Sequence, residues 1–209
     1  MGLAIFLRKR AQVNRFRDVV IDSINAGVGT KSTLCSGFFQ EMFKSSPYCA
    51  SAERNLALVL ANNGIELTTI GIHNNTWLPS YKNFRNSLRN AGVNILAKYS
   101  TSFHWHAKIF ILKQVDDPIL AVVGSSNITR NAFSVSSPHN VEADVFMWRD
   151  SILPLTTIIE GMIAATIEDP HEVIVADYDP HRNANLTIDD RLKRLDAELK
   201  EYPLRDLPE

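Results

Sequence analysis

Two histidines and a lysine occupy alternate positions in the segment "HWHAKIF", at His104, His106 and Lys108. Side chains two residues apart on a β-strand share a face, so His106 and Lys108 should point the same way, with His104 if the strand begins early enough. The segment "GSSNITR" (124–130) follows closely and adds glycine, hydroxyl and amide groups. Glycine permits a tight backbone and the close approach of a ligand. An imidazole, an ammonium and an amide that converge on one point predict a phosphate pocket containing a nucleophile.

A β-hairpin is expected to bring the two segments together. "HAKIFILK" (106–113) and "ILAVVGS" (119–125) flank the turn sequence "QVDDP". Further strands are expected at 33–39, 65–72, 93–99, 141–148 and 172–178, and helices at 15–27, 51–64, 79–92, 152–167 and 187–202. This alternation predicts an α/β fold in which helices sandwich a mixed β-sheet.

The bulk composition is that of a soluble globular protein, with 45% apolar and 22% charged residues in a chain of 209. Residues 1–130 carry 15 lysines and arginines against 7 acids, whereas 131–209 carry 7 against 16. Such asymmetry suggests a half that faces a polyanion, although two ordinary surfaces can also differ by chance. We expect a catalytic domain over 1–180, with a loop and helix at 181–209 appended to it and packed on the same body.

Cysteine usage and hydropathy favour a cytoplasmic protein. The chain has two cysteines, Cys35 and Cys49, too few for a disulfide framework. No apolar run approaches the ~18 residues that a membrane span needs. The start "MGLAIFLRKR" places its apolar residues before its basic ones, the reverse of a signal peptide.

The motifs resemble the signature of the phospholipase D superfamily. His106-Ala107-Lys108 matches its H-x-K, Gly124-Ser125-Ser126-Asn127 matches its G-S-x-N beyond a hairpin, and "NVE" supplies a downstream Glu142. The resemblance covers about residues 30–150 and implies a phospholipase D-like fold. The segment "GSSNITRNAF" is most similar to that of nuclease-type members, namely the metal-independent restriction endonucleases and small bacterial endonucleases.

The resemblance implies a phosphodiesterase that forms a covalent phosphohistidine at His106. Lys108 and Asn127 would bind the non-bridging oxygens, Ser125 would add a hydrogen bond, and Glu142 would orient the imidazole of a neighbouring histidine. A second histidine would protonate the leaving oxygen and later activate water. No cofactor and no metal is expected, because cationic side chains replace the metal.

A second H-x-K is absent from the sequence: His73, His139, His171 and His181 have no lysine two residues on. In the family that the sequence resembles, single-motif members are homodimers with one composite site. This points to a twofold dimer that pairs one His106 from each subunit.

Two features depart from the family pattern. Lys113 stands where the family usually has Asp, with Asp116 and Asp117 further along, and the spacing from Asn127 to Glu142 is long enough for an insertion over the site.

The substrate is expected to be DNA, with RNA left open. Basic residues gather at 8–17 and 82–98, where they could follow a nucleic-acid backbone or form an ordinary solvated face. The candidate substrate-binding residues are Ser126, His104, Arg130, Lys82 and Arg85. Trp77 and Tyr81 could stack on an unpaired base, although packing within the protein is favoured. A role in restriction or other defence follows from the resemblance alone, and target selection could come from a separate targeting subunit.

Other classes of protein remain as alternatives. One is a non-catalytic nucleic-acid-binding module that keeps the pocket, and another is a lipid or small-molecule phosphodiesterase. A third is a zinc hydrolase built on His104, His106 and His139, which Lys108 beside the pair would disfavour because it repels a cation.

Overall fold

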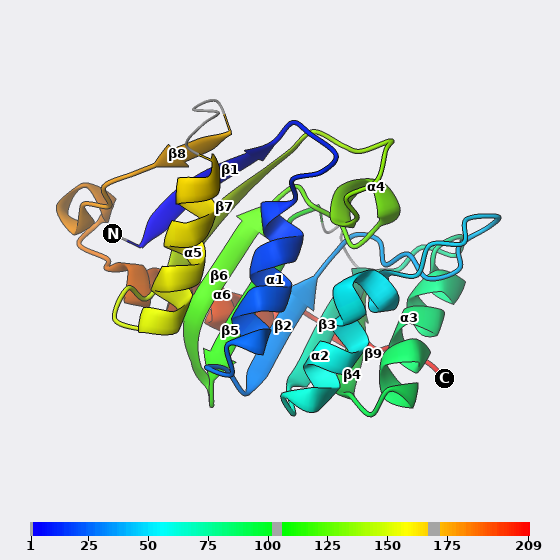
Figure 1. Ribbon diagram of the computed structural model, residues 1–209. Helices are drawn as coiled ribbons and strands as arrows, with labels where there is room; N and C mark the ends of the chain where they lie inside the picture. Colours follow the sequence, from blue (N-terminus) through cyan, green and yellow to red (C-terminus); the bar gives the residue numbers. More distant parts are fainter. Residues whose placement is uncertain (1, 102–105, 167–171) are drawn as a thin grey trace.

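A nine-stranded mixed β-sheet forms the centre of the protein in the computed structural model, which describes residues 2–101, 106–166 and 172–209 (Figure 1). Its strands lie in the order β8–β1–β7–β6–β5–β2–β3–β4–β9. Their bounds are β1 Leu3–Arg8, β2 Lys31–Cys35, β3 Glu66–Ile72, β4 Asn94–Ser100, β5 Lys108–Gln114, β6 Asp117–Gly124, β7 Glu142–Trp148, β8 Val173–Val175 and β9 Leu204–Asp206.

The sheet combines a parallel part with an antiparallel part. β2, β3 and β4 run parallel to one another, and the remaining neighbours pair antiparallel, including the β5–β6 hairpin. Helices cross over between the parallel strands, since antiparallel strands can be joined by tight turns but parallel ones cannot. The predicted fold class, a mixed sheet sandwiched by helices, is confirmed.

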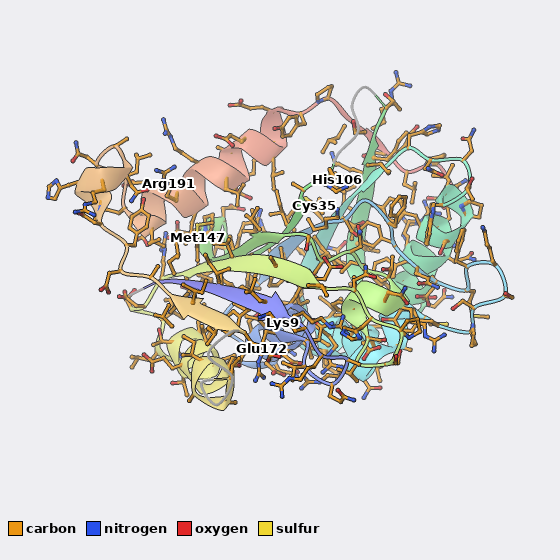
Figure 2. All side chains as sticks on the ribbon, turned by 90° about the horizontal axis from the view of Figure 1, so that it is seen from above. Lys9, Cys35, His106, Met147, Glu172 and Arg191 are labelled. Carbon is orange, nitrogen blue, oxygen red and sulfur yellow. The ribbon has the colours of Figure 1, made fainter. Side chains whose placement is uncertain are left out.

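Helices cover both faces of the sheet. α1 (Arg15–Asn25), α2 (Leu56–Asn62), α3 (Leu78–Asn90) and α5 (Leu153–Thr166) lie on one face, and α6 (Ile188–Glu201) lies on the other (Figures 1 and 2). Short turns complete the chain: α4 (Arg130–Phe133) and the 3-10 helices η1 (Ala50–Asn55) and η2 (Pro180–Asn183). None of the described helices is long and apolar enough to cross a bilayer.

Two apolar cores follow from this layering. The larger core packs α1, α2, α3 and α5 against Phe6, Phe110, Val122 and Phe146 of the sheet. The smaller core lies under α6, where Leu192 and Leu199 pack against Cys35, Ile70, Ile109, Ile111 and Ala121. β5 contributes to both cores and is buried on both faces up to Lys113. The hairpin that carries the candidate site residues therefore has little freedom to move.

The last helix packs on its own body, as the sequence suggested. Thr187 forms a capping box with Asp190 at its start, and β9 then adds a strand to the edge of the sheet beside β4. The expected boundary between a catalytic domain and an appended segment near residue 180 stays a prediction.

The structure differs from the predicted elements mainly at the ends of the chain. β1 and β9 were not predicted, yet β1 lies inside the sheet between β7 and β8. Its residues alternate between buried and half-buried, as expected for a strand. This pattern was missed because the first ten residues were compared only with a signal peptide. The helix predicted at 51–64 is divided, because positive φ angles at Arg54 and Asn55 separate η1 from α2. β2 also ends earlier than expected, at Cys35.

Candidate active site

Several strands end at the same edge of the sheet, and the candidate residues gather there. The register pairs Lys108, the first residue of β5, with Gly124, the last residue of β6. Gly124 also pairs with Asp144 of β7, and Arg8 at the end of β1 pairs with Glu142. Segments separated widely in the sequence therefore meet at one edge, as the hairpin predicted for H-x-K and G-S-x-N requires.

Gly124 is needed for this convergence. A Cβ atom at this position would clash with the Asp144 carboxylate and with the main-chain carbonyl of Ala143. The strand that carries Ser125 can thus lie directly against β7, which carries Glu142 and Asp144.

Lys108 is a buried cation, with 4% of its surface exposed, and His106 is exposed beside it. Lys108 Nζ lies 3.4 Å from His106 Nδ1. An ammonium can only donate, so Nδ1 would be the accepting nitrogen in this contact. In the described part of the chain no carboxylate lies close enough to form an ion pair with Lys108. Burial lowers the pKa of Lys108, and the charges of Glu142 and Asp144 offset part of that effect.

Glu142 is held by two neighbours on adjacent loops. The Ser125 hydroxyl donates a hydrogen bond to Glu142 Oε2, and Asn140 Nδ2 donates to Oε1 at 2.9 Å. The Ser125 oxygen also accepts the Ala143 main-chain N–H at 3.0 Å. Ser125 thus donates its only hydroxyl proton to Glu142, and its expected hydrogen bond to a phosphate stays a prediction.

Asp144 lies two residues beyond Glu142, so both side chains are on the same buried face of β7. The Ser126 hydroxyl donates to its Oδ2 at 2.7 Å, and the Ser126 N–H to its Oδ1 at 3.4 Å. Burial raises the pKa of Asp144 to about 6 in spite of these hydrogen bonds. Ser126 is itself buried against this carboxylate, which does not favour the predicted contact between Ser126 and a substrate.

The amide of Asn127 is oriented by the loop after β2. Ser36 Oγ lies 3.2 Å from Asn127 Oδ1 and also accepts the N–H of Ile128 at 3.0 Å. The Ser36 hydroxyl proton has a nearer acceptor in the Phe38 carbonyl at 2.7 Å, so its contact with Asn127 is the weaker of the two. In this orientation the Nδ2 hydrogens of Asn127 would be the groups that donate to a ligand. Asn127 also lines a pocket of about 430 Å³, with Phe38, Gln40, Ser46, Trp77, Thr129, Arg130, Asn131 and Asn140.

Arg8 anchors the segment between Asn127 and Glu142 from below. Its buried guanidinium donates to main-chain carbonyls of this segment, at 2.9 Å to Asn131, 2.9 Å to Ala132 and 2.6 Å to Ser134. Burial lowers the pKa of Arg8, and the carboxylate of Glu142 offsets part of this effect. The long spacing noted in the sequence is therefore an ordered loop around α4, pinned to β1.

Not every predicted site residue lies at this edge. Arg85 is buried, with 2% exposed, and donates to the carbonyls of Leu207 and Pro208 at 3.0 and 3.1 Å. Lys82 donates to the Glu209 carbonyl at 2.7 Å. Both side chains of α3 therefore hold the C-terminal segment, an arrangement that does not favour the predicted contact with a nucleic-acid backbone. His104 lies outside the described residues. Arg130 lines the pocket beside Asn127.

The basic run at 8–17 is largely neutralised within the protein. Arg10 pairs with Glu172 at 2.8 Å, and Arg17 pairs with Asp18 at 2.6 Å and Glu53 at 3.1 Å. Together with the carbonyl contacts of Arg8, these pairs mean that the run is mostly structural. The count of basic residues in the sequence does not show that much of this charge is paired within the protein.

The residues considered for a zinc site or for base stacking lie in different parts of the structure. His139 Nε2 lies 3.0 Å from the Lys9 carbonyl. Within residues 2–101, 106–166 and 172–209, no group of His, Cys, Asp and Glu side chains could hold a metal ion. Tyr81 is buried, and its hydroxyl donates to the Lys98 carbonyl at 2.9 Å and lies 2.8 Å from the Thr69 hydroxyl, so it belongs to the core. Trp77 is half-buried and lines the pocket.

Sequence reasoning missed several residues of the site. Asp144 could have been found from the alternation Glu-Ala-Asp, because residues two apart on a strand share a face. Arg8 could have been found from the alternation of Ala4, Phe6 and Arg8, had 3–8 been recognised as a strand. Ser36 and Gln40 carry no local signal, since their partners are brought to them only by the fold.

Comparison with known proteins finds similarity only in structure: no family model and no curated relative matches the chain. Nuc, a phospholipase D family member from Salmonella typhimurium, is 13% identical over 85% of this chain and 99% of its own, with a TM-score of 0.44. NucT from Helicobacter pylori is 14% identical over 83% and 98%, with a TM-score of 0.39. Phosphatidylserine synthase from Haemophilus influenzae is 12% identical over 95% and 46%, with a TM-score of 0.47.

Proposed function

We propose that the protein is a metal-independent phosphodiesterase in which His106 is the nucleophile, and that it acts as a DNA endonuclease. The single observation that carries the proposal is the placement of Lys108. It is a buried cation without a carboxylate partner in the described structure, 3.4 Å from an exposed imidazole, at the edge where Asn127 and Glu142 also lie. A buried charge without an ion pair is costly, and an anionic substrate would supply the missing partner.

The proposed reaction has two displacements at phosphorus. A nitrogen lone pair of His106 forms a bond to phosphorus while the bond to the leaving oxygen breaks, and a second imidazole gives that oxygen its proton. Water then loses a proton to the second imidazole and attacks phosphorus, which breaks the phosphorus–nitrogen bond and restores both rings. The net change is hydrolysis of one phosphodiester.

The side chains around His106 supply charge stabilisation. The Lys108 ammonium and the Asn127 amide donors would bind the non-bridging oxygens, whose negative charge grows in the pentacoordinate state. Burial in the sheet restrains Lys108, and the side-chain oxygen of Asn127 lies 3.2 Å from Ser36 Oγ. Such preorganised donors need no rearrangement when the charge develops.

The second imidazole is proposed to be His106 of another copy of the chain. The two rings would carry different protonation states, because the nucleophile needs a free lone pair and the acid needs a proton. The acid must be an imidazolium with protons on both nitrogens, and the nucleophile must be a neutral ring with its lone pair on Nε2 and its proton on Nδ1. Because Nδ1 donates in both states, its contact with Lys108 must be exchanged for one with a carboxylate, and Glu142 is proposed to accept that hydrogen bond.

Plasmid cleavage in excess EDTA tests the activity. Nicking that survives chelation and is lost in His106→Ala supports the proposal. His139→Ala is a matched control, since His139 lies on the neighbouring loop and contacts the Lys9 carbonyl. Folded protein that never nicks points to the non-catalytic binding module, and activity restored by zinc points to a zinc hydrolase.

Mixing the variants tests the composite site. If two chains share one site, adding excess His106→Ala chains to wild-type protein lowers the activity per wild-type chain in proportion to the wild-type share. Activity per wild-type chain that does not change on mixing, after subunits have exchanged, contradicts a shared site.

A further inference from the structure

The pocket beside Asn127 has a composition suited to one ligand class. Two aromatic rings, Phe38 and Trp77, line it together with amide side chains, one guanidinium and hydroxyl groups; no carboxylate is among the described residues that form its wall. Its volume of about 430 Å³ lies within the range of roughly 300–1,000 Å³ found for small-molecule sites. Flat apolar surfaces combined with amides suit an aromatic heterocycle that carries donors and acceptors on its rim.

The aromatic wall is built in advance. Trp77 stacks on Phe43 with ring centroids 3.8 Å apart and an interplanar angle of 14°, and it contacts Phe38 at 4.8 Å. These rings come from the loop after β2 and from the residue that precedes α3. Because neighbouring rings hold Trp77 in place, little side-chain entropy is lost when a ligand stacks on this wall.

The polar wall is also fixed. Gln40 Oε1 accepts the Arg130 main-chain N–H at 2.8 Å, and Asn140 donates to Glu142 at 2.9 Å. Asn127 and Asn140 belong both to the pocket and to the proposed reaction centre. A group bound in this pocket would therefore be joined to the reacting phosphate by a short linkage.

We propose that the pocket binds an unpaired nucleobase next to the phosphate that is cleaved, so that the preferred substrate is single-stranded or locally unpaired nucleic acid. This inference rests on the proposed function. Every nucleobase has a face that stacks on aromatic rings and an edge that amide side chains can read. A base inside a duplex cannot enter a pocket without leaving its stack, which explains the predicted preference for unpaired strands.

The test compares two single-stranded oligonucleotides of equal length and charge, one with normal bases and one with tetrahydrofuran abasic residues through its centre. Wild-type kcat/KM should be about tenfold or more higher for bonds flanked by bases, as expected from stacking of one base. Trp77→Ala should remove most of this ratio and leave cleavage at the abasic bonds within about twofold of wild type. Trp77→Phe should retain most of the ratio, and Tyr202→Ala, an aromatic residue at the end of α6, should retain all of it.

Equal cleavage of the two oligonucleotides by wild-type protein overturns the inference. The inference is also overturned if Trp77→Ala loses the same fraction of kcat/KM on both oligonucleotides and Trp77→Phe falls below wild type on both. If no oligonucleotide is cleaved, the proposed function fails separately. The pocket is then judged by fluorescence anisotropy of the same labelled oligonucleotides with His106→Ala. Tighter binding of the base-bearing strand, lost in His106→Ala/Trp77→Ala, supports the pocket, and equal binding of both strands overturns it.

Discussion

β5 carries two buried lysines that differ in their surroundings. Lys113, 8% exposed, points toward α6 and forms an ion pair of 2.7 Å with Asp196. Lys108, 4% exposed, lies at the other end of the strand and faces His106 instead of a carboxylate. A paired cation is part of the fold, whereas Lys108, which has no ion-pair partner among the described residues, is proposed to bind an anion from outside. The comparison teaches that the charge of a residue matters less than whether the fold already neutralises it.

The largest expected effect is the loss of turnover in Lys108→Met. Removing a preorganised donor to the transition state should lower kcat by about 10²- to 10³-fold. Stability at pH 7 should stay equal or rise, because the desolvated ammonium is gone. Cleavage of an oligonucleotide and urea unfolding measure the two effects.

Lys113→Met is the matched control for this change on the same strand. Its turnover should stay within about twofold of wild type after correction for folded protein. A loss of turnover as large as that of Lys108→Met would show that the two lysines do not differ as described.

Breaking the Lys113 pair should instead lower stability. Lys113→Met leaves Asp196 buried with only the exposed Lys200 at 2.7 Å, so we expect a loss of about 2 kcal/mol or more in the free energy of unfolding. Lys113→Met/Asp196→Leu should recover most of that loss, since two apolar side chains can replace a buried pair. Urea denaturation of the single and double variants checks this, and a double variant less stable than the single one would contradict it.

Arg8 shows that a cation at the edge of the sheet that carries the candidate site can also be structural. Its guanidinium is satisfied by the carbonyls of Ala11, Asn131, Ala132 and Ser134. Arg8→Met should leave these acceptors unpaired and cost about 2–3 kcal/mol. Hydrogen exchange should rise in residues 128–141 and not in α6. Unchanged exchange in that segment would mean that Arg8 does not hold the loop.

The last predicted effect is a change in the pH dependence of stability at Asp144. Its pKa of about 6 exceeds the value of about 3.9 for an unfolded aspartate, so the folded protein binds this proton more tightly. Protonation adds stability that is fully present below about pH 4 and is lost as the pH rises through about 6, by about 2–3 kcal/mol. Asp144→Asn should remove this slope from the stability curve. Parallel curves for wild type and variant between pH 4 and 7 would contradict the raised pKa.

Much of the fold was readable from the sequence because most elements carry strong periodic patterns. The hairpin at 106–125 and the helix at 187–202 are examples, and both lie where they were predicted. β9 could not be predicted, since its three residues are a strand only because β4 offers an edge. β1 was missed because its pattern is short and its pairing partners, β7 and β8, lie far along the chain.

The candidate site was predictable where its residues share a motif. His106 and Lys108, and Ser125 and Asn127, are close in sequence and meet across one hairpin. The predictions for Arg85 and for the run at 8–17 rest on charge alone, because the sequence shows a charge but not its partners. Arg85 finds carbonyls of the C-terminal segment, and Arg17 finds Asp18 and Glu53.

The most direct test of the central claim is to trap the covalent intermediate. Wild-type protein would be mixed in EDTA with an oligonucleotide carrying ³²P in its internal phosphates, quenched in alkaline detergent, and digested for peptide mapping. The account predicts label on His106, stable in alkali, labile in acid, and absent from His106→Ala. Cleavage that proceeds without labelled protein, and at an undiminished rate in His106→Ala, would contradict it.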